Sequence, residues 1–378
     1  MTNVVIAGYA RTPFQPAHKG KLTQVRPDDL AAIAVKGLIA QTHVAPQDIE
    51  DLILGCAFPE AEQGFNMARL VVLLAELPIT IAGTTVNRFC GSSMQSIHMA
   101  AGAINMNAGE VFICAGVESM TRVPMTGFNP MPNPVLHGHM PGAYMSMGET
   151  AENVGRMYRI SRDEQENFAL RSQKKAASAQ ADGRLASEIV SVNTNAIDIN
   201  QDGCLRPETT LEALAELKLA FDQHGTVTAG TSSPLTDGAA AVLVCSLDYA
   251  ERNNITPLAQ IVSTAVAGCD PETMGLGPIF ASRKALDRAG VKANALDVIE
   301  VNEAFATQAI ACIRDLDLAE EHINKDGGAI ALGHPLGATG ARITGKAASI
   351  LAREGGRFAL STQCIGGGQG IATVMKAI

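Results

Sequence analysis

Two cysteines in the sequence stand beside residues that would put a thiol to use. Cys90 follows an apolar, strand-like run and precedes Gly91-Ser92-Ser93, where a helical pattern opens. A thiol at a helix N-terminus is expected to have a lowered pKa, because the positive end of the helix dipole stabilises its thiolate. Cys90 is therefore the candidate nucleophile. Cys364 precedes glycines 366–368, whose N–H groups can face a ligand, and its thiol could carry a proton there. A buried cysteine and a plain glycine turn are the alternatives.

A histidine and an asparagine supply the other groups that acyl chemistry needs. His334 lies in Gly333-His334-Pro335, a pattern typical of a turn, where a histidine can act as the base for a cysteine. Asn302 ends the apolar run 298–301, and the strand ends of an α/β fold face the crevice in which ligands bind. The alternatives are a structural histidine and a helix N-cap.

These four residues together indicate acyl transfer through a thioester, coupled to making or breaking a carbon–carbon bond. One thiolate would hold the acyl group, and the second thiol would move a proton at the α-carbon. The histidine would activate the nucleophile and stabilise an enolate oxygen. A phosphate-binding loop is a rival interpretation, because residues 340–346 nearly match its pattern. Ala347 stands where a hydroxyl should hold Mg²⁺ and no strand precedes the run, so an ordinary helix is predicted there.

Composition and charge argue against several other classes of protein. The 378 residues are 47% hydrophobic and carry a net charge of −9, which argues against disorder and against nucleic-acid binding. The sequence contains no run of about 18 apolar residues, so no membrane span is predicted. The first residues are typical of a strand rather than a signal peptide. The eight cysteines form no CxxC motif, so no metal site is predicted and a reducing, cytoplasmic location is expected.

The elements that must position these residues alternate between strands and helices, which is typical of an α/β fold. Strands are predicted at 2–7, 51–55, 111–116, 239–246, 260–266, 297–301 and 357–363. Helices are predicted at 28–41, from a capping box at 161–164 to about 181, around 211–217, and at 280–289 before Gly290. Residues 81–91 and 358–368 share a pattern, an apolar strand that runs into a cysteine followed by glycine, which suggests a duplication. Residues 121–150 are rich in proline and methionine and read as a lid over a substrate, a loop packed on a partner subunit, or both.

Taken together, these motifs resemble the thiolase family, and within it the bacterial degradative branch that acts on 3-ketoacyl-CoA. The resemblance extends from residues 10–13 to Gly370. The motifs that carry it are 86–92, 147–153, 230–238, Asn302-Glu303-Ala304-Phe305, Gly333-His334-Pro335-Leu336-Gly337 and Cys364-Ile365-Gly366-Gly367-Gly368. Ser146 and Thr231-Ser232-Ser233-Pro234 depart from the acetoacetyl-specialised relatives, whereas residues 118–125 resemble the degradative type. The resemblance implies cleavage of 3-ketoacyl-CoA by CoA to acetyl-CoA and a shortened acyl-CoA. The alternative is an acetyl-CoA C-acetyltransferase that makes or cleaves acetoacetyl-CoA.

The family also implies a fold and partners. The expected fold has five layers, αβαβα, with two duplicated halves and an inserted loop domain. The expected division is 1–118 plus 235–257 for the first half, 119–234 for the insertion and 258–378 for the second half. A homodimer or a dimer of dimers is implied, with acyl-CoA as ligand, CoA as co-substrate and no bound cofactor. Fatty-acid β-oxidation and a hydratase/dehydrogenase partner are further expectations, and no membrane or nucleic-acid partner is expected.

By the same resemblance, Cys90 is the acylated nucleophile, His334 its activator and Cys364 the general acid/base. One oxyanion hole would be His334 with a water on Asn302, and the other the backbone N–H groups of Cys90 and Gly366. Positions that match the family's CoA contacts are Arg206 and Ser233 for the nucleotide and pantetheine, and Phe221, Met147, Met274 and Phe305 for the apolar channel. A ketoacyl synthase and a non-catalytic subunit are the rivals. The second cysteine and Asn302 argue against the first, and the intact catalytic set argues against the second.

Overall fold

The computed structural model describes residues 2–194 and 197–378, and its centre is one mixed β-sheet. The described strands of this sheet follow the order β10-β11-β12-β9-β1-β8-β5-β3-β4, and a short β2 pairs with β8. Their bounds are β1 Val4–Arg11, β2 Gln15–Pro16, β3 Asp51–Gly55, β4 Ala82–Val86, β5 Val111–Ser119, β8 Thr236–Ser246, β9 Ala259–Gly268, β10 Val298–Val301, β11 Phe358–Ile365 and β12 Gln369–Lys376. A separate ribbon pairs β6 (Val192–Asn193) with β7 (Asp198–Ile199).

The sheet consists of two halves that meet at one narrow seam. Strands β4, β3, β5, β8 and β1 form the first half, and β9, β12, β11 and β10 form the second. Only the pairs Val5↔Gln260 and Ile6↔Ala259 join β1 to β9. The resemblance implies that each half supplies its own mixed sheet, and in the structure these two parts are joined at this seam into one hydrogen-bonded sheet. Every residue of β1, β5 and β8 is buried, as expected for strands that are covered on both faces.

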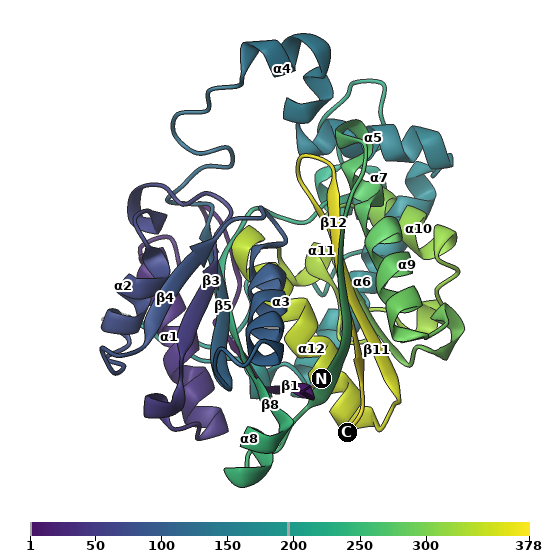
Figure 1. Ribbon diagram of the computed structural model, residues 1–378. Coiled ribbons are helices and arrows are strands. Elements are labelled where there is room, and N and C mark those ends of the chain that lie inside the picture. The colour runs from purple at the N-terminus through teal and green to yellow at the C-terminus, as the bar shows by residue number, and fades with distance from the viewer. Residues whose placement is uncertain (1, 195–196) are drawn as a thin grey trace.

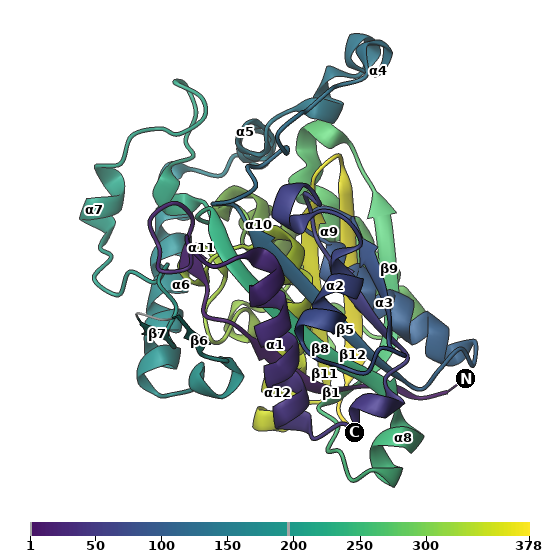
Figure 2. The same ribbon diagram turned by 90° about the vertical axis from the view of Figure 1, so that its left-hand side faces the viewer.

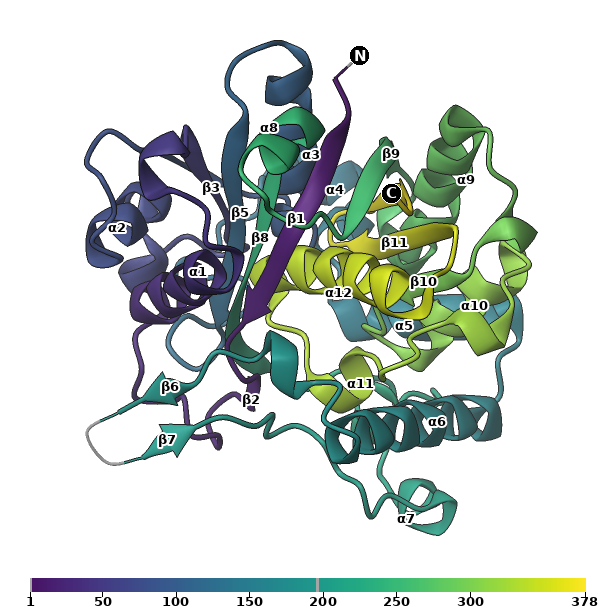
Figure 3. The same ribbon diagram turned by 90° about the horizontal axis from the view of Figure 1, so that it is seen from below.

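Helices cover both halves and separate them, which produces the five layers predicted (Figures 1 and 3). Helices α1 (Pro27–Thr42) and α2 (Met67–Leu74) cover the outer face of the first half. Helices α3 (Ser92–Asn105) and α12 (Thr339–Glu354) pack against each other between the halves, and α9 (Gly277–Ala289) and α10 (Ala306–Asp315) form the other outer layer. Separate apolar cores fill the interfaces between these layers. Burial of apolar surface at several interfaces therefore holds the layers together.

Local signals account for where most elements begin and end. Ser161 and Glu164 form the predicted capping box that opens α6 (Arg162–Ala181). Gly290 takes the left-handed conformation that ends α9, although this helix starts at Gly277, before the predicted 280. β12 was not among the predicted strands. Gly367 and Gly368 have positive φ and turn the chain directly from β11 into β12, so the glycine run forms the turn of a hairpin.

The segment between β5 and β8 adds no described strand to the large sheet. It contains α4 (Pro134–His139), α5 (Met147–Tyr158), α6 and α7 (Leu211–Ala215), and α4 projects away from the layers (Figures 1 and 2). The remaining helices are α8 (Leu247–Arg252) and the short α11 (Ala329–Leu332). The residue boundaries proposed for the halves and the insertion stay predictions. Among the described residues, no helix is both long and apolar enough to cross a membrane.

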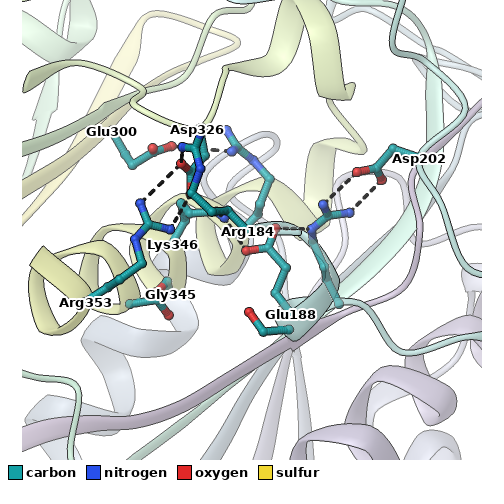
Figure 4. A network of polar contacts seen from close by, with 12 residues as sticks. Arg184, Glu188, Asp202, Glu300, Asp326, Gly345, Lys346 and Arg353 are labelled. Atoms are coloured by element: carbon teal, nitrogen blue, oxygen red, sulfur yellow. Dashed lines mark hydrogen bonds and ion pairs between the residues drawn. The ribbon is translucent and has the colours of Figure 1, made fainter. Parts of the chain in front are cut away.

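A buried network of ion pairs ties this segment to β1 and α12 (Figure 4). The Arg11 guanidinium binds both oxygens of Asp202 at 2.7 Å and also contacts Glu188 at 2.8 Å. Lys346 of α12 pairs with Glu188 and Asp326. Lys346 is the lysine of the run that resembles a phosphate-binding loop. The structure confirms the predicted helix there and shows that this ammonium group neutralises buried carboxylates.

Candidate active site

Cys90 lies in a tight turn between β4 and α3, two residues before the helix begins. Phe89 holds a left-handed φ of 42°, which non-glycine residues seldom adopt outside constrained turns. The Ser92 hydroxyl accepts from the Arg88 N–H at 2.9 Å and donates to the Phe89 carbonyl at 2.6 Å. The predicted place of Cys90 at a helix N-terminus is therefore confirmed, and local hydrogen bonds fix the turn.

The protonation state of Cys90 is opposite to the one predicted. The thiol is buried, and burial raises its pKa to about 12, with the charge of Glu118 acting in the same direction. The backbone N–H of Gly366 donates to the sulfur and lowers the pKa. The prediction of a lowered pKa was wrong because desolvation of the thiolate outweighs the helix end. Cys90 is a neutral thiol at pH 7 and requires a base.

His334 sits in a turn between α11 and the 3₁₀ turn Leu336–Ala338, as predicted. Gly333 has a φ of 104°, which a side chain there would disfavour. The His334 backbone N–H donates to Thr236 Oγ1 at 3.0 Å, and its ring Nδ1 lies 2.6 Å from Thr339 Oγ1. The Thr339 hydroxyl hydrogen already donates to the Pro335 carbonyl at 2.9 Å. Thr339 must therefore accept from Nδ1–H, which leaves the lone pair on Nε2.

Burial makes His334 a neutral imidazole. It lowers the pKa of the ring to about 3, and the nearby Arg342 charge acts in the same direction. A neutral ring whose Nε2 carries the lone pair can accept a proton from a neutral thiol. The raised pKa of Cys90 and the lowered pKa of His334 are therefore compatible. Neither residue is charged at rest, and a proton moves only when the thiol reacts.

Asn302 connects the histidine to the second half of the sheet. It directly follows β10, as predicted, and its backbone N–H donates to the Thr362 carbonyl at 3.0 Å. Its side-chain amide nitrogen lies 3.4 Å from His334 Nε2. Its Oδ1 atom is buried with no hydrogen-bond partner in the described part of the chain. The alternative of a helix N-cap is wrong, because Phe305 occupies that position of α10.

Cys364 is a strand residue that faces the first thiol across the two halves. It lies one residue before the end of β11, so the strand predicted at 357–363 continues through Cys364. The neighbouring Gln363 side chain donates to the Cys90 carbonyl. The pKa of Cys364 is raised, first by burial and then by the closeness of Cys90. Gly366 begins the turn after β11 and presents its N–H to Cys90, so the end of β11 and its turn hold both thiols close together.

An apolar wall adjoins Cys364. Its members are the four apolar residues matched by resemblance to the pantetheine and acyl channel, and Ser233 lies beside it. Met147, Met274 and Phe305 pack with Cys364 in one cluster. The Phe221 ring meets the Phe305 ring edge-on at 5.8 Å between centroids, and the Ser233 N–H donates to the Ala304 carbonyl at 2.9 Å. Arg206 stands apart from this cluster: its side chain is exposed, and its backbone N–H donates to Gln173 at 2.9 Å.

Four supporting residues escaped prediction from the sequence. Thr236 and Thr339 hold the histidine, Gln363 holds the Cys90 carbonyl, and Glu118 binds the loops around them. All four lie within or beside the motifs singled out above, but their residue types alone give no signal of a role. Within residues 2–194 and 197–378, no three histidine, cysteine or acidic side chains are grouped as a metal site.

Comparison with known proteins agrees with this arrangement. The family model described as Thiolase, N-terminal domain, matches residues 4–248, and that described as Thiolase, C-terminal domain, matches residues 255–377. Two similar proteins named 3-ketoacyl-CoA thiolase come from Marinomonas sp. (strain MWYL1), 47% identical over 386 residues, and Bacillus subtilis (strain 168), 46% identical over 389 residues. The alignments cover 100% of this chain and 98% and 100% of those proteins.

Solved structures give the same result. The crystal structure of human mitochondrial 3-ketoacyl-CoA thiolase in complex with CoA superposes with a TM-score of 0.92 at 38% sequence identity. The match covers 100% of this chain and 98% of the human chain. With both family models, full-length relatives and this superposition in agreement, the chain belongs to the thiolase family.

Proposed function

We propose that this protein cleaves 3-ketoacyl-CoA with CoA to yield acetyl-CoA and an acyl-CoA shortened by two carbons, through an acyl-enzyme on Cys90. The names of its full-length relatives support this acyltransferase activity. The observation that carries the proposal is that Cys90 lies close to Cys364 and packs in one apolar cluster with Leu336, two residues from the neutral His334. These groups come from both halves of the fold.

The first half-reaction uses Cys90 as nucleophile. His334 Nε2 takes the thiol proton while the sulfur attacks the 3-keto carbon. The backbone N–H groups of Cys90 and Gly366 would hold the resulting oxyanion. The bond between C2 and C3 then breaks and leaves the acyl group on Cys90. The departing enolate would be stabilised by His334 and by a water on the free Oδ1 of Asn302, and Cys364 donates its proton to the enolate carbon.

The second half-reaction restores the enzyme. The Cys364 thiolate takes the proton of the CoA thiol, and the CoA sulfur attacks the acyl group on Cys90. The Cys90 sulfur leaves and recovers its proton from the His334 imidazolium. Both cysteines and the histidine return to their starting states, so protons and electrons balance. Run in reverse, the same steps describe condensation.

The ligand contacts belong to the same proposal. The wall of Met147, Met274, Phe221 and Phe305 fits the pantetheine and the acyl chain, because it is apolar and ends at Cys364. Ser233 lies next to this wall through its contact with Ala304. Arg206, exposed to solvent, is proposed to meet the charged nucleotide of CoA. CoA is a co-substrate here, and no resident cofactor is needed for these steps.

A second copy of the chain is the proposed partner. Strand β4 is the last strand of the sheet, so its outer edge is open to pairing. Beside it, Phe65 is 93% exposed, and Leu73 and Leu74 at the end of α2 are also exposed. Exposed apolar side chains next to an open strand favour a homodimer paired along β4. Sedimentation of the full chain distinguishes this dimer from a tetramer and from a monomer.

The cellular setting is inferred from the same chemistry. Shortening of 3-ketoacyl-CoA suits fatty-acid β-oxidation, and a hydratase/dehydrogenase would supply the 3-keto substrate. All eight cysteines are free thiols, which supports a reducing compartment such as the cytoplasm.

The deciding experiment compares CoA-dependent cleavage of a short and a medium-chain 3-ketoacyl-CoA by the purified protein. Cleavage of both, or of the longer one alone, is the expected result. Cleavage confined to acetoacetyl-CoA would instead assign the protein to the acetyltransferase branch. Failure to cleave either substrate would refute the proposed activity.

A further inference from the structure

Two buried glutamates flank the turn that carries His334, one from each half of the fold. Glu118 is the penultimate residue of β5, and Glu303 follows Asn302 beyond β10. Their exposed fractions are 0% and 2%. In the described part of the chain, neither carboxylate forms a salt bridge. A buried charge without an ionic partner is costly, so what these oxygens bind is informative.

Glu118 holds the C-terminal end of the turn, here defined as residues 330–337. Its Oε2 accepts the backbone N–H of Gly337 at 2.9 Å and that of Ala57 at 2.9 Å. Its Oε1 accepts the Gln63 amide at 2.7 Å and the Phe58 N–H at 3.2 Å. One carboxylate thus fastens the His334 turn to the loop that follows β3.

Glu303 holds the N-terminal end of the same turn. Its Oε2 accepts the backbone N–H of Ile330 at 3.2 Å and the Ser172 hydroxyl at 2.6 Å, and its Oε1 accepts the Asn324 amide at 2.7 Å. The Ser172 oxygen in turn accepts the Gly328 N–H at 3.2 Å, so its hydrogen must point to Glu303. The turn is therefore tied at Ile330 and at Gly337, on either side of His334.

We propose that Glu118 and Glu303 are positioning residues that fix both ends of the His334 turn and thereby keep His334 Nε2 in place to deprotonate Cys90. This inference rests on the proposed base role of His334. A carboxylate suits this task because the oxygens of both side chains only accept hydrogen bonds. Glutamine would present an NH₂ group to one set of these donors and could not replace it.

The test measures labelling of Cys90 by iodoacetamide at pH 7.5, with the Cys90 peptide followed by mass spectrometry. It compares Glu303→Gln in the wild-type background and in a His334→Ala background. With His334 present, we expect labelling to slow about tenfold, the size of one lost buried hydrogen bond to a charge. Without His334, the same substitution should change the rate less than twofold. A residue that only supports the fold would give equal effects in both backgrounds.

Asp297→Asn is the matched control. The Asp297 carboxylate also accepts two backbone N–H groups, those of Arg357 at 2.7 Å and Phe358 at 3.1 Å, but at the opposite end of β10. Asp297→Asn should therefore leave Cys90 labelling unchanged. Glu118→Gln is tested in the same cycle. The Glu118 charge also acts on Cys90 directly, whether or not His334 is present. We therefore compare how strongly Glu118→Gln slows Cys90 labelling with His334 and without it, and we expect the first effect to be about ten times the second.

Two results would overturn the inference, and they can be told apart. If Glu303→Gln slows labelling equally with and without His334, the glutamates do not act through the turn. If His334→Ala itself leaves labelling unchanged, the proposed base role is wrong and this inference fails with it. Should Glu303→Gln not fold, Ser172→Ala removes only the hydroxyl beside Glu303. It should then slow labelling about threefold, and only when His334 is present.

Discussion

Replacing Thr339 with valine tests whether one hydroxyl sets the tautomer of His334, the proposed base. Valine keeps the branched shape of threonine but cannot accept the hydrogen of His334 Nδ1, which lies 2.6 Å from Thr339 Oγ1. The Nδ1–H tautomer would then contain a buried, unpaired donor. The other tautomer would place its hydrogen on Nε2, toward Asn302, whose Oδ1 is free to accept it after the amide rotates. That tautomer cannot take a proton from Cys90.

The size of the effect follows from this competition. Leaving a buried donor unpaired costs about 1–3 kcal/mol. Because 1.36 kcal/mol corresponds to a factor of ten, the productive tautomer and kcat should fall roughly 5- to 150-fold. The substitution also removes the hydrogen bond from Thr339 to Pro335 at the start of α12, which should lower the free energy of unfolding by about 1 kcal/mol. The loss of activity should therefore greatly exceed any effect of unfolding at 25 °C.

The assay is steady-state thiolysis of a 3-ketoacyl-CoA at saturating CoA, together with ¹⁵N chemical shifts of the His334 ring. We expect kcat to fall with little change in KM, and the ring shifts to report hydrogen on Nε2. Thr373→Val is the matched control, because Thr373 Oγ1 likewise lies 2.8 Å from a histidine ring, that of His98. This control should keep kcat within twofold.

The reasoning is refuted if Thr339→Val folds normally and retains kcat within twofold of the wild type. It is also refuted if kcat falls while the ring shifts still place the hydrogen on Nδ1. In either case another group would be setting the tautomer of His334.

Three further predictions concern the same residues. Cys90→Ser should abolish thiolysis, because a serine hydroxyl is a poor nucleophile for the neutral His334 to activate; turnover above about 1% of wild type would contradict this. Cys364→Ala should still acquire an acyl group on Cys90, detected by intact-protein mass, but should lose exchange of the acetyl-CoA α-proton with D₂O; equal loss of both steps would argue against separate roles. The third is pH-dependent stability. The pKa of His334 is about 3 in the folded protein and about 6.5 when unfolded, so the unfolded chain binds more protons between these values. The stabilising contribution of neutral His334 is complete above pH 6.5 and is lost as pH falls toward 3, so urea unfolding should show a shallower decline from pH 6.5 to 4 for His334→Asn than for wild type. An identical decline in both proteins would show that His334 does not contribute.

The amino-acid sequence by itself determined several local elements and nominated the reacting groups. Strand 51–55 has the predicted bounds, and the capping box at Ser161 opens α6 where expected, since caps and apolar patterns involve only nearby residues. Cys90, His334, Asn302 and Cys364 could be singled out because each has unusual neighbours: a helix start, a glycine–proline turn, a strand end or a glycine run. Such neighbours mark where chemistry is possible without giving distances.

Only the tertiary structure decided how these groups behave. The pKa of Cys90 moves opposite to the local prediction, because burial depends on how both halves pack around the thiol. The tautomer of His334 depends on the hydrogen bond that Thr339 already makes to Pro335, and the turn that carries His334 depends on glutamates more than 200 residues earlier and about 30 residues earlier. Burial and hydrogen-bond direction arise from segments far apart in the chain, so they exist only once the two halves have come together.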